Sequence, residues 1–302
     1  ILESVGLGTP ERKAWALYDW ANSAFATTVM AAFLPFYYQD VAAVQLDDTT
    51  ATAYWGYTTA LALALVAVAS PVLGAVADYV GAKKRFLAAF MGTGATFSAL
   101  LWLTGEGDWL FASTVFIVAN AGFAGANVFY EALLPSVAKG GDIDRVSTAG
   151  YALGYLGGGV LLALNAAWFV SPQTFGFADG GEAVRASFVS VAIWWVLFSL
   201  PLFRTVHEPP ARLSPGETAG LDPVRVGLGR VAGTLREVRR YPDLFLFLLA
   251  FLVYNDGVGT IIKMASIYGA EIGIDRTDLV GAFLLVQFAG VPFTCLLYTS
   301  PS

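Results

Sequence analysis

The most constraining feature of this sequence is a succession of eight apolar segments, each long enough to cross a lipid bilayer as a helix. A bilayer core is about 30 Å thick and needs about 20 apolar residues per helix. The runs are too long and too evenly apolar for the alternating strands of a transmembrane barrel. They fall at residues 14–38, 53–77, 86–104, 109–134, 147–170, 186–203, 244–264 and 278–298. The sequence therefore predicts an all-α polytopic membrane protein.

Composition supports this fold class and excludes several kinds of site. The chain is 57% hydrophobic and 13% charged, whereas soluble domains carry about 25% charged residues. The single cysteine, Cys295, and the single histidine, His207, exclude a disulfide framework and a thiolate or multi-histidine metal centre. A net charge of −6 argues against nucleic acid as a partner. We expect the lipid bilayer and a small-molecule substrate as partners, with no metal and no cofactor.

The basic residues predict the orientation in the membrane. Fourteen of the 17 lysines and arginines fall on one side of the predicted segments. They are Arg12, Lys13, Lys83, Lys84, Arg85, Lys139, Arg145, Arg204, Arg212, Arg225, Arg230, Arg236, Arg239 and Arg240. The positive-inside rule places this side, and the N-terminus with it, in the cytoplasm. The composition, rich in alanine and glycine, favours the cytoplasmic membrane of a prokaryote.

A basic loop divides the chain into three parts. Residues 1–203 form a predicted six-helix transmembrane bundle, 204–243 the cytoplasmic loop, and 244–302 the first two helices of a second bundle. Within the loop, apolar residues at helical spacing make one stripe: Val224, Leu228, Val231, Leu235 and Val238. Arginines flank the stripe, so we expect an amphipathic helix on the membrane interface. The alternative is a solvated linker helix that packs on the bundle.

The loop between the second and third segments carries a recognisable motif. Residues 74–85 read GAVADYVGAKKR, which resembles the G-x-x-x-D-x-x-G-x-K/R-K/R signature of the major facilitator superfamily. Glycine allows a tight turn and a close helix approach, and the aspartate can pair with a cation. We therefore expect a conformational latch between cytoplasmic helix ends, and an ordinary basic loop is the alternative. The latch residues are Gly74, Asp78, Gly81, Lys83, Lys84 and Arg85.

Glycines recur along the fifth segment. With Gly141 before them, Gly150, Gly154, Gly158 and Gly159 resemble the antiporter motif of the same superfamily, in which Tyr155 here replaces a proline. A glycine every four residues makes a flat face that another helix can approach closely. Plain helix packing, without any bearing on transport direction, is the alternative interpretation.

Three further stretches are similar to the vacuole effluxer family within that superfamily. Residues 18–25, 129–135 and 254–260 read YDWANSAF, FYEALLP and YNDGVGT. The resemblance covers roughly residues 11–294 and implies a twelve-helix transporter connected with amino-acid efflux. The chain departs from the family after Phe293, and we expect residues 295–302 to be a non-native tail.

Polar residues inside the apolar segments are the candidate substrate and proton-coupling groups, because a charge at the bilayer centre costs on the order of 2.5–3.5 kcal/mol on insertion scales. They are Asp19, Asn22, Asn120, Asn127, Glu131, Asn255 and Asp256. Asp256 is the deepest, and Gly257 and Gly259 follow it. The resemblance implies that these helices line a central cavity, whereas hydrogen bonding between helices is the structural alternative.

These features predict a secondary active transporter of small solutes that works by alternating access, with amino-acid efflux and proton coupling as its finer functions. Two other classes stay open: a receptor or scaffold on the same fold, and a membrane-embedded enzyme. The enzyme has little support, because the glycine-rich run at 154–159 lies inside a membrane segment and not after a strand. Substrate flux in vesicles separates the first class from the other two.

Overall fold

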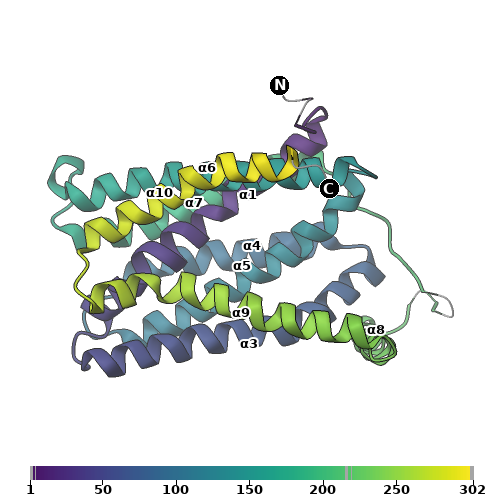
Figure 1. Cartoon of the computed structure of the whole chain (residues 1–302), viewed down its shortest axis with the longest axis horizontal. Helices are drawn as coiled ribbons and strands as arrows, with labels where there is room; N and C mark the ends of the chain where they lie inside the picture. Colours follow the sequence, from purple (N-terminus) through teal and green to yellow (C-terminus); the bar gives the residue numbers. More distant parts are fainter. Residues whose placement is uncertain (1–2, 4, 215–216, 219, 300–302) are drawn as a thin grey trace.

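Helices make up all the regular structure in the part of the chain that the computed structural model describes, residues 3, 5–214, 217–218 and 220–299 (Figure 1). Side chains are described as far as Thr294. Seven helices in this part are long and apolar enough to cross a membrane. They are α3 (Asp48–Val80), α4 (Lys83–Leu100, continued by the 3-10 turn Leu101–Leu103), α5 (Trp109–Val137), α6 (Asp142–Val170), α7 (Gly180–Thr205), α9 (Pro242–Glu271) and α10 (Arg276–Thr299). The predicted all-α polytopic membrane fold is confirmed.

The first predicted segment, 14–38, differs from the prediction because it is not one regular helix. It consists of α1 (Pro10–Ala24), the π-helix η1 (Phe25–Phe33), α2 (Leu34–Tyr37) and the π-helix η2 (Tyr38–Ala42). Pro35 contributes to the break, since it lacks the N–H that would bond to the carbonyl of Ala31. The Ser266 hydroxyl of α9 donates to that carbonyl at 2.5 Å.

The first six membrane segments pack into one bundle. Helix α1 lies against α6 and α7, and α5 lies against α3 and α4. Lipid tails are as apolar as the helices, so close van der Waals packing between small residues holds such helices together. A Cβ on Gly122 of α5 would lie 2.4 Å from the backbone nitrogen of Gly94 in α4, which shows how closely these two helices approach. Buried aromatic residues such as Trp15, Phe116 and Trp195 fill the remaining volume.

Helices α9 and α10 have different surroundings. In Figure 1, α10 runs beside α6, and the two helices pack along much of their length. The side chains of 242–258 in α9 are exposed, whereas Ser266 and Ile267 near its C-terminal end are buried. Helix α9 therefore meets the six-helix bundle chiefly near the turn that leads into α10.

Loops that were predicted to share a side of the membrane lie at the same end of the bundle. At one end of the bundle, Arg12 near the start of α1 pairs with Asp142 at the start of α6 at 2.8 Å. At the same end, the Lys84 ammonium of α4 donates to the carbonyl of Phe203 near the end of α7 at 3.0 Å. At the opposite end, Arg276 pairs with Asp40 at 2.7 Å. The cytoplasmic placement of the first end stays a prediction.

The basic loop contains the expected helix, α8 (Pro223–Val238), which begins after the capping residue Asp222. Gly227 is buried against Val72 and Val76 of α3, so α8 packs across one end of that helix. The apolar residues Val224, Leu228 and Leu235 are exposed. An exposed apolar stripe fits a membrane interface, and that location, like the three-part division of the chain, stays a prediction.

The expectation of a non-native tail concerns residues 295–302. The backbone of α10 continues to Thr299. The side chains of 295–299 and all of 300–302 lie outside the described residues, so the expectation is not tested.

Candidate functional site

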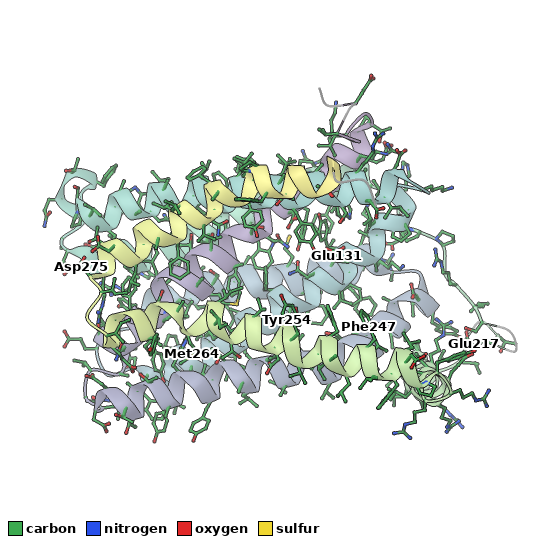
Figure 2. The ribbon with its side chains drawn as sticks, in the orientation of Figure 1. Glu131, Glu217, Phe247, Tyr254, Met264 and Asp275 are labelled. Atoms are coloured by element: carbon green, nitrogen blue, oxygen red, sulfur yellow. The ribbon has the colours of Figure 1, made fainter. Side chains whose placement is uncertain are left out.

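A cavity of about 550 Å³ lies between α1, α5 and α6 on one side and α9 and α10 on the other. Four of the predicted substrate or coupling residues line it: Asp19, Asn22, Asn127 and Glu131. Figure 2 places Glu131 between the ribbons of α5 and α10. Drug-sized ligands occupy pockets of about 300–1,000 Å³, so the cavity has room for a small solute.

Helix α1 contributes one polar face to this cavity. Asp19, Asn22 and Ser23 are three and four residues apart, so they project from the same side of the helix. The Ser23 hydroxyl donates to Asp19 Oδ1 over a long 3.4 Å. The Asn22 amide donates to Asn127 Oδ1 at 2.5 Å and joins α1 to α5. Asn22 is 3% exposed, so its amide helps to hold the wall, and Asp19 supplies the charge.

Tyrosines that sequence reasoning did not single out form another part of the wall. Tyr130, Tyr151 and Tyr155 line the cavity. Tyr130 stacks on Trp15 with ring centroids 4.4 Å apart, and the Trp15 indole N–H donates to the backbone carbonyl of Tyr130 at 3.1 Å. In the described part of the chain, the hydroxyl of Tyr130 is buried without a hydrogen-bond partner. The position of Tyr130 next to Glu131 in the FYEALLP stretch was the available signal.

Three predicted residues lie elsewhere. Asn120 is buried within α5 at 4% exposure and does not line the cavity. Asn255 and Asp256 are exposed on α9, in the turn that follows the labelled Tyr254 of Figure 2, and neither lines the cavity. The structure thus brings together the polar residues of α1 and α5, and it leaves those of α9 apart from them.

The predicted glycine face of α6 meets two different helices. A Cβ on Gly150 would lie 2.8 Å from the Trp15 ring, and one on Gly158 would lie 2.8 Å from Thr27, both on the first membrane segment. Gly159 faces Gln287 of α10 instead, and Gly141 has nothing within 4 Å of a Cβ. Packing accounts for most of this face, and a role in antiport stays a proposal.

Two glycines of α6 bear directly on the cavity wall. A Cβ on Gly154 would lie 2.6 Å from Ser23 Oγ and 3.1 Å from Asp19 Cγ, so glycine leaves the space that the Asp19 carboxylate occupies. Sequence reasoning missed Gly157, where a Cβ would lie 2.3 Å from the carbonyl oxygen of Trp20. Gly157 is therefore the point of closest approach between α6 and α1.

The predicted latch lies at the junction of α3 and α4. The Lys83 ammonium pairs with Asp78 Oδ1 at 2.7 Å and donates to the carbonyl of Ala132 in α5 at 3.1 Å. Gly81 has φ +67, and a Cβ there would lie 2.6 Å from the backbone nitrogen of Ala211, so the turn requires glycine. Gly74 approaches α5 at ordinary van der Waals distance, 3.7 Å from Val128.

The segment after α7 is tied to this junction. The backbone N–H of Lys84 donates to the Glu208 carboxylate at 3.0 Å, while the side chain of Arg85 is exposed. The backbone N–H of Arg212 donates to the carbonyl of Asp78 at 2.8 Å. The latch residues thus hold three helix ends and the basic loop together.

A clip between the loop and α8 adds to this attachment. Arg230 donates to Glu217 through its Nε at 3.0 Å and its terminal nitrogen at 2.6 Å. This hydrogen bonding lowers the pKa of Glu217 to about 2. Tyr79 of α3 donates to the carbonyl of Thr218 at 2.7 Å and lies under the Arg230 guanidinium, which is 5.8 Å from the ring centroid. The clip therefore joins α3, the loop and α8.

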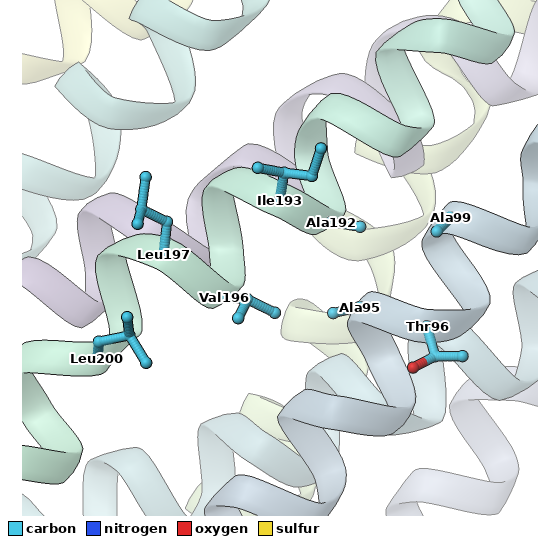
Figure 3. Close-up of a pocket in the computed structure, with 8 residues that line it drawn as sticks. All are labelled: Ala95, Thr96, Ala99, Ala192, Ile193, Val196, Leu197 and Leu200. Carbon is cyan, nitrogen blue, oxygen red and sulfur yellow. The ribbon is translucent and has the colours of Figure 1, made fainter.

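A second hollow, of about 450 Å³, lies between α4 and α7 and offers no comparable chemistry (Figure 3). Its lining is apolar apart from one threonine: Ala95, Thr96, Ala99, Ala192, Ile193, Val196, Leu197 and Leu200. We therefore place the candidate site in the cavity beside α1.

The chain is similar over most of its length to a family of vacuole effluxers and to a protein described as an MFS-type transporter. The family described as vacuole effluxer Atg22 like matches residues 41–297. YxiO of Bacillus subtilis, described as an uncharacterized MFS-type transporter, is 35% identical over 290 residues, which cover 95% of this chain and 67% of that protein. Autophagy-related protein 22 of Eremothecium gossypii is 22% identical over 327 residues, covering 92% of this chain and 62% of that protein.

A shorter match involves autophagy-related protein 22 of Yarrowia lipolytica, which is 23% identical over 164 residues, covering 49% of this chain and 27% of that protein. The chain thus spans from about a quarter to two thirds of the length of these relatives. The matched helices include those that carry Asn127, Glu131 and the glycine face of α6. The chain belongs to the vacuole effluxer Atg22-like family of MFS-type transporters.

Proposed function

We propose that this chain forms part of a secondary active transporter that exports small solutes, amino acids among them, by alternating access and in exchange for protons. The observation that carries the proposal is the cavity between the six-helix bundle and α9–α10, lined by Asp19, Asn127 and Glu131. In transporters that alternate access, the substrate site lies between two helix bundles that rock against each other.

The contacts between the two groups of helices support this mechanism. Arg276 of α10 makes a bidentate pair with Asp40, at 2.7 and 3.0 Å, and Ser266 of α9 donates to the carbonyl of Ala31. Helices α9 and α10 join at the end of the bundle opposite α8 (Figure 1), where Arg276 begins α10. The two contacts can break without unfolding either group, as a rocking movement requires. The Asp78–Lys83 latch lies at the other end, where its contacts would change in the opposite sense.

The proposal assigns proton coupling to membrane carboxylates. Asp19 and Glu131 line the cavity, and Asp256 lies outside it on an exposed face of α9. A carboxylate in each group of helices could take up a proton in one facing state and lose it in the other. We keep Asp256 as a coupling candidate on these grounds.

Flux in proteoliposomes tests the proposal. The complete transporter, reconstituted with an outward or inward pH gradient, is expected to move radiolabelled amino acids or amines faster than empty vesicles, and the gradient should drive accumulation. A receptor or scaffold on the same fold would bind solutes without moving them. Binding without flux for every solute offered would overturn the proposal.

A further inference from the structure

We propose that the cavity selects an organic amine with a net positive charge, held by the carboxylates of Asp19 and Glu131, over a zwitterionic amino acid. The inference rests on the proposed function and deepens it by naming the class of substrate. It follows from the charge of the lining, the aromatic walls and one buried hydroxyl.

The charged residues described in the cavity lining are both acidic. Of the described residues that line the cavity, two are carboxylates and none is lysine, arginine or histidine. Lys83 pairs with Asp78 and Arg276 pairs with Asp40. The half-buried Lys263 follows the lining residue Ile262 on α9 but does not itself line the cavity. Asp19 is half-buried and Glu131 is exposed, and a carboxylate at membrane depth is costly without a cationic partner. A cationic solute supplies the missing partner, whereas the carboxylate of an amino acid would face two anions.

The walls suit the body of such a solute. Phe123, Tyr151, Tyr155 and Phe283 present aromatic side chains to the cavity, and the faces of such rings attract cations. A Cβ on Gly290 of α10 would lie 2.8 Å from the ring of Tyr155. That ring is therefore packed between α6 and α10.

The buried hydroxyl of Tyr130 supports a ligand site independently of the charges. Tyr130 lines the cavity and is 2% exposed, and no described residue forms a hydrogen bond with its hydroxyl. A buried polar group without a partner is costly and uncommon in native proteins. The hydroxyl lies beside α6, where a Cβ on Gly150 would be 3.3 Å from it. A polar atom of the solute would satisfy the hydroxyl by entering between α5 and α6 at this point. A compact amine with a polar tip therefore matches the cavity better than an apolar compound does.

Tyramine and tyrosine make the sharpest pair of probes, since they share a phenol and an amine and differ in one carboxylate. We expect the purified complete transporter to bind tyramine at least tenfold more tightly than tyrosine at pH 7, measured by competition with radiolabelled tyramine. Glu131→Gln and Asp19→Asn are each expected to weaken tyramine binding at least tenfold. Glu106→Gln removes an exposed carboxylate outside the cavity and should leave the affinity unchanged.

The binding measurements test the inference, and flux measurements test the proposed function separately. Equal or tighter binding of tyrosine, no binding of tyramine, or unchanged affinity in both cavity variants would overturn the inference. Thermal unfolding of each variant shows that it is folded, and if Asp19→Asn does not fold, Glu131→Gln carries the test. Counterflow in proteoliposomes separates the two proposals. Tight binding of tyramine without flux of any solute would overturn the proposed transport and leave the charge selectivity intact. Flux of tyrosine alone would support transport and overturn the charge selectivity.

Discussion

Replacing Gly157 by alanine tests the close approach of α6 to α1, on which the shape of the cavity depends. The added Cβ would lie 2.3 Å from the carbonyl oxygen of Trp20 and 2.7 Å from its ring. A carbon and an oxygen in contact normally stay about 3.3 Å apart. The two helices must therefore separate by about 1 Å, because a backbone carbonyl cannot rotate away within a helix.

The expected cost follows from this overlap. Overpacking of this kind costs about 1–3 kcal/mol, and alanine recovers roughly 0.5–1 kcal/mol of helix propensity. At about 2–4 °C per kcal/mol, the thermal midpoint of the complete transporter in detergent should fall by a few degrees. Tyramine affinity should fall too, since α1 carries Asp19 and moves with Trp20.

A matched control is available in another membrane helix. Gly92 of α4 has nothing within 4 Å of an added Cβ, so Gly92→Ala should leave the midpoint unchanged or raise it slightly. Fluorescence-detected size exclusion after heating measures both variants. A midpoint of wild-type value for Gly157→Ala, or an equal loss for Gly92→Ala, would refute the packing argument.

Four further predictions concern the latch, the clip, the orientation and the coupling residue. Asp78→Asn leaves the buried ammonium of Lys83 without its ion pair, so it should lower stability by about 1–3 kcal/mol. It should also slow counterflow without preventing insertion. A wild-type rate of counterflow would mean that the motif is an ordinary loop and not a latch. The pKa of Glu217, about 2, lies below its ordinary value of about 4.3, so the clip should be intact above about pH 4.3 and be lost as pH falls toward 2. Pepsin cleavage within 212–222 should accelerate over that window, and Arg230→Gln should be cleaved rapidly throughout it. Cysteines introduced at 48, 107 and 180 should react with an impermeant reagent from outside the cell, and reaction only from the cytoplasmic side would invert the orientation. Asp256→Asn should keep folding and solute binding but lose accumulation driven by a pH gradient, and unchanged accumulation would make Asp256 structural.

Much of the architecture could be predicted because it depends on local properties of the chain. Segment length and hydropathy place helices in a bilayer regardless of their neighbours. The capping residue Asp222, Pro223 and the apolar stripe after them predict α8 within the loop. The spacing of Gly74, Asp78 and Gly81 likewise predicts a turn that needs glycine, and the φ of +67 at Gly81 agrees with it.

The break in the first segment could be anticipated only in part. Pro35 is visible in the sequence, and a proline inside a helix removes one backbone hydrogen bond. The two π-helices, Phe25–Phe33 and Tyr38–Ala42, spread the interruption over many more residues. Ser266 lies more than 200 residues away in the chain and still donates to the carbonyl of Ala31, a contact that no local pattern indicates.

What the sequence determined by itself is that the chain spans a membrane, roughly where its membrane segments lie, and which loops share an end. These features follow from the length and hydropathy of each segment and from counting along a helix. What only the tertiary structure decided is which faces meet. Helix α9 is apolar nearly all round, so its sequence does not indicate that Asp256 lies outside the cavity. Rotation about a helix axis is set by packing between neighbours, and packing at Gly154 and Gly157 is what brings Asp19 to the cavity that Glu131 shares.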